Sequence, residues 1–309
     1  MARRTPPEEN IPLIVYKPFV WRNFPPRKPA GPPPSDIPVM TAAPEPFDPP
    51  EPYTKYDGHF IGVDSDRAGC DYSQWTPLSK IHGVQPKGGH PTQKIIFVNG
   101  ILNSPKNEYD SMQEIANQAN AEVVGVYNAT EGFWKDFAQC VKDKLGIGHN
   151  PAVETLKNTL YFELTSGSQQ PINLMAHSQG ALITSRALGE VRNQLQEDGL
   201  SPKEIDARMS RINVDTFGGA ASGYPNGPHY NHYVNAADPV AGLFGRALPA
   251  WSPAAAVAAA PFVGAGAGAH THWSATADIH AGNPVSAVHG FTEVYLKGWQ
   301  SPFPRNAPQ

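Results

Sequence analysis

A serine between an expected strand and an expected helix is the residue of this sequence best suited to nucleophilic chemistry. Residues 172–180 read Ile-Asn-Leu-Met-Ala-His-Ser-Gln-Gly, so an apolar run ends at Ser178 and an amphipathic stretch begins at Gln179. The backbone of such an elbow is strained, and the residues two before and two after the serine must be small. Here they are Ala176 and Gly180. The pattern indicates a nucleophilic serine beside the N–H groups and the positive dipole end of a helix.

A serine hydroxyl is a weak nucleophile and needs a base, which in turn needs an orienting carboxylate. On an elbow of this kind the chain order is serine, acid, histidine. Two aspartates after the serine lie near strand ends, Asp215 and Asp238. Asp215 is followed by two more strand-like residues, whereas Asp238 follows a strand directly and precedes Pro239. We therefore prefer Asp238 as the acid, with a buried hydrogen-bonding role as the alternative for Asp215.

Six histidines lie downstream of the serine, and His289 is placed best for the base. It stands in an expected loop just before a helical stretch, where it could be held over the sheet. His280 is the alternative. His229 and His232 precede the preferred acid, against the expected chain order. His177 adjoins the serine on a sharp turn, so its ring points elsewhere and we predict a packing or orienting role.

An oxyanion hole requires two backbone N–H groups. One should come from Gln179, the residue after the nucleophile, and the other from the loop after the first parallel strand. Residues 99–103 fill that place and read Asn-Gly-Ile-Leu-Asn. Within them Gly100 permits a close approach of the backbone, because glycine has no Cβ atom.

Four segments of the chain resemble a known group of enzymes. Residues 176–180 are similar to the Gly-His-Ser-x-Gly elbow of α/β-hydrolase lipases, with Ala in place of the first Gly. Three downstream segments look more specifically like the class 3 (fungal triacylglycerol) lipases, over roughly residues 94–300. Type VI secretion lipase effectors of bacteria share this layout. The three segments are 214–219, with Gly219 in place of Ser, then 233–240 and 289–296.

The resemblance implies hydrolysis of a lipid ester, by a lipase or phospholipase, through an acyl-enzyme. Ser178 would attack, Asp238 would orient His289, and Ile101 would supply the second oxyanion N–H. The likeness to the effectors implies an exported antibacterial toxin with an immunity or delivery protein as partner. Two other functions stay open: a hydrolase of small esters or thioesters, and a catalytically silent hydrolase-fold binding module.

Strands and helices alternate around these residues, which predicts an α/β domain with a mostly parallel sheet covered by helices on both faces. With the resemblance, this becomes an α/β-hydrolase fold over residues 94–300. Residues 54–93 form an unassigned region expected to pack on the core. We expect strands at 95–98, 121–127, 172–176, 212–217 and 232–236, and helices at 107–120, 134–145, 152–164 and 179–197.

The ends and one internal segment differ from this domain in composition. Sixteen of the 33 prolines lie in residues 1–53, which predicts an extended arm, and residues 301–309 form a tail. The start of the chain has no apolar signal-peptide stretch, so we expect synthesis in the cytoplasm without one. Residues 247–269 carry no charge. They predict either an apolar cap that could touch a membrane surface or an Ala/Gly loop.

Composition excludes several classes of protein. Lys and Arg number 24 and Asp and Glu 28, a net charge of −4, which argues against a nucleic-acid binder. Two cysteines, Cys70 and Cys140, cannot form a disulfide scaffold or a four-thiolate zinc site. The pairs His229/His232 and His270/His272 lack acidic or cysteine partners at familiar spacing. We therefore expect no metal and no cofactor.

Overall fold

The computed structural model describes residues 53–65, 69–101, 103–129, 150–221, 223–243, 268–275, 277–278 and 285–303. Several expectations lie outside these residues. They are the proline-rich arm up to residue 52, the helix at 134–145, residues 247–267 of the expected cap, His280, Cys140 and the tail from residue 304.

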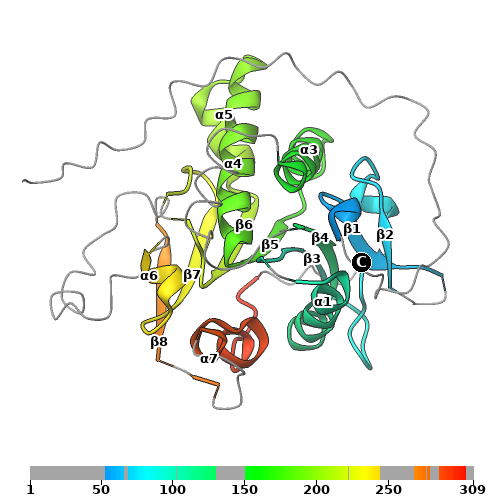
Figure 1. Cartoon of the computed structure of the whole chain (residues 1–309). Helices are drawn as coiled ribbons and strands as arrows, with labels where there is room; N and C mark the ends of the chain where they lie inside the picture. Colours follow the sequence, from blue (N-terminus) through cyan, green and yellow to red (C-terminus); the bar gives the residue numbers. More distant parts are fainter. Residues whose placement is uncertain are drawn as a thin grey trace, which may run out of the picture. The chain divides into compact units, whose positions relative to one another are not determined.

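The described strands form one sheet in the order β2-β1-β4-β3-β5-β6-β7-β8 (Figure 1). The six strands from β3 to β8 run parallel, whereas β1 is antiparallel to both β2 and β4. The predicted mostly parallel sheet of an α/β-hydrolase fold is confirmed. The strands are β1 (Phe60–Val63), β2 (Gly69–Tyr72), β3 (Gln93–Val98), β4 (Ala121–Val126), β5 (Ile172–His177), β6 (Ile212–Phe217), β7 (His229–Asn235) and β8 (His270–Ser274).

Helices cover both faces of the sheet, as predicted (Figure 1). One face packs against α1 (Pro105–Ala119) and the π-helical turn η5 (Phe291–Leu296). The other packs against α3 (Pro151–Thr165), α4 (Gln179–Glu197) and α5 (Pro202–Met209). The remaining short elements are η2 (Tyr53–Tyr56), η3 (Leu78–Lys80), α6 (Pro239–Leu243) and α7 (Ser286–His289).

The central strands are apolar because both of their faces are covered. All six residues of β5 are buried, and alternate side chains enter opposite cores. Leu174 belongs to the core under α3 and α4, and Met175 to the core under α1 and η5. The sheet thus holds the end of β5, where the expected nucleophile lies, between two packed layers.

Several elements depart from the sequence-based expectations. Helix α1 begins at Pro105 rather than at residue 107, because Ser104 caps it by accepting a hydrogen bond from the Asn107 N–H. Strand β7 begins three residues earlier than expected. The helix α5 was not predicted, although Ser201 and Glu204 form a capping box at its start. Strands β1, β2 and β8 were also not predicted.

Glu108 in α1 is an ionisable residue whose side chain lies in the protein interior. Its side chain is fully buried, and neither carboxylate oxygen has a hydrogen-bond partner among the described residues. A Cβ atom on Gly125 of β4 would lie 2.3 Å from Oε1, so this glycine makes the room for it. Burial raises the pKa of Glu108 well above its usual value.

We expect Glu108→Met to raise the free energy of unfolding by about 1–3 kcal/mol at neutral pH, because it removes an unsatisfied buried carboxyl group. The folded-state pKa is raised, so the stability linked to this group is present in acid and lost as pH rises through that pKa. The advantage of the variant should therefore grow with pH. Urea unfolding at several pH values, with exposed Glu197→Met as control, measures it. A stability difference between Glu108→Met and the wild type that does not change with pH, or that decreases as pH rises, would contradict this explanation.

Candidate active site

Ser178 occupies the elbow between β5 and α4 with a left-handed backbone, φ 55° and ψ −120°. Such a conformation is costly for a residue with a side chain and persists only where the surroundings impose it. Three backbone hydrogen bonds do so. The Ser178 N–H donates to the Phe217 carbonyl at 3.0 Å, and its own carbonyl accepts from Ala181 at 3.1 Å and from Ala220 at 2.9 Å. The hydroxyl is thereby fixed above the strand end.

Two glycines allow the backbone to come close to this elbow. A Cβ atom on Gly180 would lie 2.2 Å from the carbonyl oxygen of Val98, so α4 can start against β3 only with glycine there. A Cβ atom on Gly100 would lie 2.9 Å from the Ser178 Cβ. The loop after β3 therefore passes directly beside the serine, as the oxyanion-hole prediction requires.

The structure brings Ser178, His289 and Asp238 together. The distance from His289 Nε2 to Ser178 Oγ is 2.8 Å, and from His289 Nδ1 to Asp238 Oδ2 it is 2.7 Å. A carboxylate accepts, so Nδ1 carries the hydrogen and Nε2 is left to accept from the serine hydroxyl. All three side chains are buried. His289 is the last residue of the short helix α7 rather than part of a loop.

Asp238 is fixed by two further hydrogen bonds. Its Oδ1 accepts from the Val240 N–H at 2.8 Å, and its Oδ2 accepts from the Tyr295 hydroxyl of η5. Tyr295 in turn accepts from the Asn235 N–H at 3.1 Å. Burial raises the pKa of Tyr295, so the phenol stays a donor. The sequence showed an aromatic-rich stretch after His289, but nothing in it singled out this tyrosine.

The backbone around His289 is held by side chains from two strands. His177 Nε2 donates to the His289 carbonyl at 3.0 Å, and Asn235 Nδ2 donates to the Val288 carbonyl at 3.0 Å. The rings of His177 and His289 lie 4.7 Å apart. Burial, and next the charge of His289, lower the pKa of His177 well below its usual value, so His177 stays neutral. These contacts agree with an orienting role for His177.

A network of amides connects the expected oxyanion loop to the start of α4. Asn99 Nδ2 donates to the carbonyls of Gly100 at 2.8 Å and Asn128 at 3.2 Å, and its Oδ1 accepts from the Asn128 N–H. Asn128 Nδ2 donates to Gln179 Oε1 at 2.8 Å. The loop that includes Ile101 and the first residue of α4 are therefore tied together on one side of the serine. This network was not predicted.

Asp215, the alternative acid, lies inside β6 and is fully buried. It accepts hydrogen bonds from Asn231 Nδ2 at 2.9 Å and Trp299 Nε1 at 3.1 Å. Burial raises its pKa to about 7. These contacts describe a buried hydrogen-bonding residue rather than a partner of His289.

The other histidines lie elsewhere in the described structure. His232 is buried and its Nδ1 lies 2.7 Å from the Thr216 hydroxyl, whereas His229, His270 and His272 are exposed. Among the described residues no three His, Cys, Asp or Glu side chains are grouped so that they could hold a metal ion. In the same part of the chain, no helix has the length and apolar character needed to cross a membrane.

Comparison with known proteins gives distant structural similarities. No protein-family model matches the chain, and no curated protein matches it. A hormone-sensitive lipase from a metagenome library aligns at 14% identity over 50% of this chain and 62% of its own length, with a TM-score of 0.30. The alignment thus spans less than two thirds of that lipase. The thioesterase RedJ of Streptomyces coelicolor aligns at 13% identity, 62% and 81% coverage and a TM-score of 0.31.

A type II thioesterase, BorB of the borrelidin cluster, aligns at 14% identity over 62% of this chain and 86% of its own, with a TM-score of 0.32. These identities and TM-scores are low, so the assignment to the α/β-hydrolase fold rests on the chain's own sheet order and on the elbow at Ser178.

The tight contact at the elbow gives a stability prediction. We expect Gly180→Ala to lower the free energy of unfolding by about 1–3 kcal/mol, because the new methyl group meets a backbone carbonyl that cannot rotate away. Gly223→Ala is the matched control, since a Cβ atom there would have none of the described residues within 4 Å. Urea unfolding of both variants tests this. Equal stability of the two would contradict the packing described here.

Proposed function

We propose that the protein is a serine hydrolase that cleaves carboxylic esters through an acyl-enzyme. One observation carries the proposal: the hydrogen-bonded series from Ser178 Oγ through His289 to Asp238, at 2.8 and 2.7 Å, starts from a strained strand–helix elbow. A serine in this setting has the base that its hydroxyl needs, and the base has its orienting carboxylate. The same geometry speaks against a catalytically silent scaffold.

In the acylation step Ser178 Oγ attacks the ester carbonyl carbon while His289 Nε2 accepts the hydroxyl proton. Asp238 stabilises the imidazolium that forms, and the oxyanion lies against the N–H groups of Gln179 and Ile101. His289 then donates its proton to the leaving oxygen, and the bond between that oxygen and the carbonyl carbon breaks. The alcohol departs and the acyl group remains on Ser178.

Deacylation repeats these steps with water as the nucleophile. His289 accepts a proton from the water as its oxygen attacks the acyl carbon, and the bond to Ser178 Oγ breaks as that proton passes to the serine. The carboxylic acid leaves and the enzyme is restored. His177, held neutral, keeps the backbone of His289 in place while the charge of the His289 ring changes.

The finer proposal, a lipid ester as substrate, is supported by the resemblance to class 3 lipases in residues 214–219, 233–240 and 289–296. Membrane contact through residues 247–269, a toxin role and an immunity or delivery partner belong to the same proposal and rest on sequence alone. Small-ester hydrolysis is the alternative, which chain-length preference on model esters separates from lipid hydrolysis.

We expect Ser178→Ala to fold normally and to lower hydrolysis of p-nitrophenyl butyrate by several orders of magnitude. Asp238→Asn and His289→Ala should each be severely impaired. Neither should add much to the loss in a double variant with Ser178→Ala, because the three side chains act as a unit. Steady-state kinetics with circular dichroism as the folding control measures this. Near-normal turnover in folded Ser178→Ala would refute the mechanism.

Tyr295→Phe removes only the hydroxyl that donates to Asp238. We expect kcat to fall about tenfold or more with KM nearly unchanged, because a hydrogen bond to a charged group contributes roughly 1.5–3 kcal/mol. Tyr230→Phe is the matched control, since its buried hydroxyl donates to the Pro225 carbonyl at 2.7 Å instead. An equal loss of kcat in both variants would show that Tyr295 has no special role in positioning the acid.

A further inference from the structure

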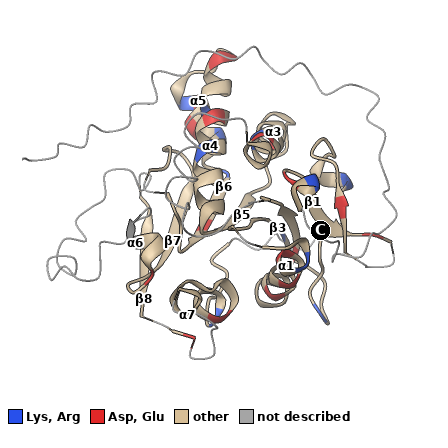
Figure 2. Ribbon diagram, in the orientation of Figure 1, with Lys and Arg blue, Asp and Glu red and all other residues tan. Residues whose placement is uncertain are grey.

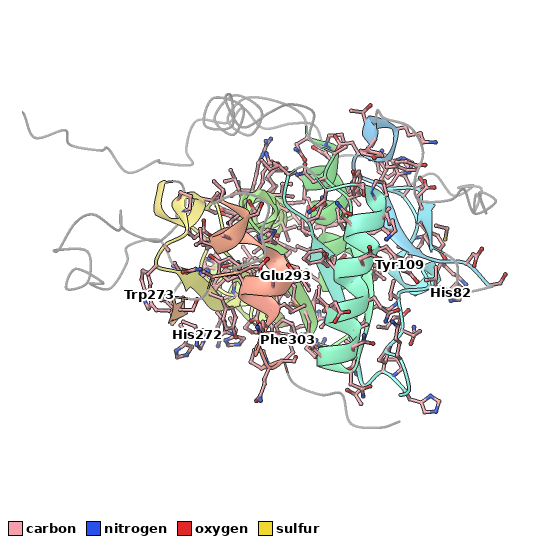
Figure 3. The ribbon with its side chains drawn as sticks, turned by 60° about the horizontal axis from the view of Figure 1, so that its bottom comes forward. His82, Tyr109, His272, Trp273, Glu293 and Phe303 are labelled. Atoms are coloured by element: carbon pink, nitrogen blue, oxygen red, sulfur yellow. The ribbon has the colours of Figure 1, made fainter. Side chains whose placement is uncertain are left out.

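A cleft of about 850 Å³ lies between α1 and the segment formed by α7 and η5. Its lining includes His289 and, from the expected oxyanion loop, Ile101. Tyr109 on α1 and Glu293 on η5 are labelled in Figure 3 and belong to its two walls. The cleft therefore borders the proposed base and the expected oxyanion loop.

The lining of this cleft combines apolar and polar side chains. Phe97 and Phe291 stack with their ring centroids 5.1 Å apart, and the Phe291 ring lies 5.2 Å from that of His177. The walls carry hydrogen-bonding side chains from both sides. From α1 these are Asn107, Ser111 and Glu114, and from the opposite side Ser286, Thr292 and Glu293.

The charge of the described lining is negative. The lining includes three acidic residues, Asp110, Glu114 and Glu293, and one Lys or Arg residue, Lys87. Asp110 is paired with Lys106 at 2.5 Å. Figure 2 shows acidic residues on α1 and on the ribbon labelled α7. The two glutamates come from opposite walls, so a group lying between them would meet carboxylates on both sides.

The positions that the reacting groups must occupy decide which part of an ester lies in this cleft. The carbonyl oxygen must face the N–H groups of Gln179 and Ile101, and the leaving oxygen must lie by His289 Nε2 to receive its proton. A cleft that meets the centre between Ile101 and His289 is therefore placed for the leaving alcohol. The acyl chain must extend in the remaining direction from Ser178.

We propose that this cleft binds the leaving alcohol and selects a neutral polyol, such as glycerol or a sugar, over an alcohol that carries phosphate. The inference rests on the proposed function. Hydroxyl groups can donate to the carboxylates of Glu114 and Glu293 and exchange hydrogen bonds with Asn107 and Ser111. A phosphate in the same place would be repelled by the glutamates. Within the lipid proposal, this selects neutral glycerides over phospholipids.

The test compares three esters of one acyl chain, short enough to stay dissolved: those of glycerol, glycerol 3-phosphate and p-nitrophenol. We expect the wild type to prefer the glycerol ester over its phosphate counterpart about tenfold in kcat/KM. Glu114→Lys and Glu293→Lys should each reduce that preference about fivefold, since one charge pair near the surface contributes up to about 1 kcal/mol. Glu197→Lys on α4 makes the same charge change on the other face of the sheet and should leave the preference intact.

The outcomes separate this inference from the proposed function. If none of the three esters is hydrolysed, both the proposed function and the selection by the cleft are overturned. Hydrolysis of the p-nitrophenyl ester with equal kcat/KM for the two glycerol esters overturns only the selection by the cleft. The selection by the cleft is also overturned if the preference for the glycerol ester is unchanged in both Glu114→Lys and Glu293→Lys. It is overturned as well if Glu197→Lys reduces that preference as much as these two variants do. A preference that shrinks at high salt in the wild type supports the electrostatic cause.

Discussion

The left-handed backbone of Ser178 is the constraint from which the rest of the site is built. A residue with a side chain holds such a conformation only where its surroundings leave no alternative. Here the Phe217 carbonyl and the N–H groups of Ala181 and Ala220 bind the serine backbone from two neighbouring elements. Gly180 lets α4 start against β3. The packing of the sheet thus offsets the strain. The hydroxyl group lies beside the loop after β3 and the start of α4.

His289 and the hydroxyl group that binds Asp238 come from one short segment. His289 ends α7, and Tyr295 in η5 donates to the same oxygen of Asp238 that faces His289. His177 and Asn235 hold the backbone of this segment from β5 and β7. Displacing it would disturb Asp238 and His289 together, so these contacts let a four-residue helix position His289.

Local pattern was enough to predict the elbow and the parallel strands β3 to β7, but not the parallel strand β8. Helix α4 starts and ends where its apolar spacing indicated, and the preference for Asp238 over Asp215 followed from where each lies relative to a strand end. Contacts between distant residues could not be predicted. The Asn99–Asn128–Gln179 network and the Tyr295 hydrogen bond depend on tertiary packing, and the short strands β1, β2 and β8 depend on their neighbours in the sheet. No local periodicity carries that information.

The proposed mechanism depends above all on the activation of Ser178 as a nucleophile by His289. Intact-mass and peptide mass spectrometry after brief exposure to a fluorophosphonate tests this without any assumption about the natural substrate. We expect a single adduct on Ser178, formed at least a hundredfold more slowly in folded His289→Ala because the base is gone. A folded wild-type protein that gains no adduct, or a His289→Ala variant that reacts at the wild-type rate, would contradict it.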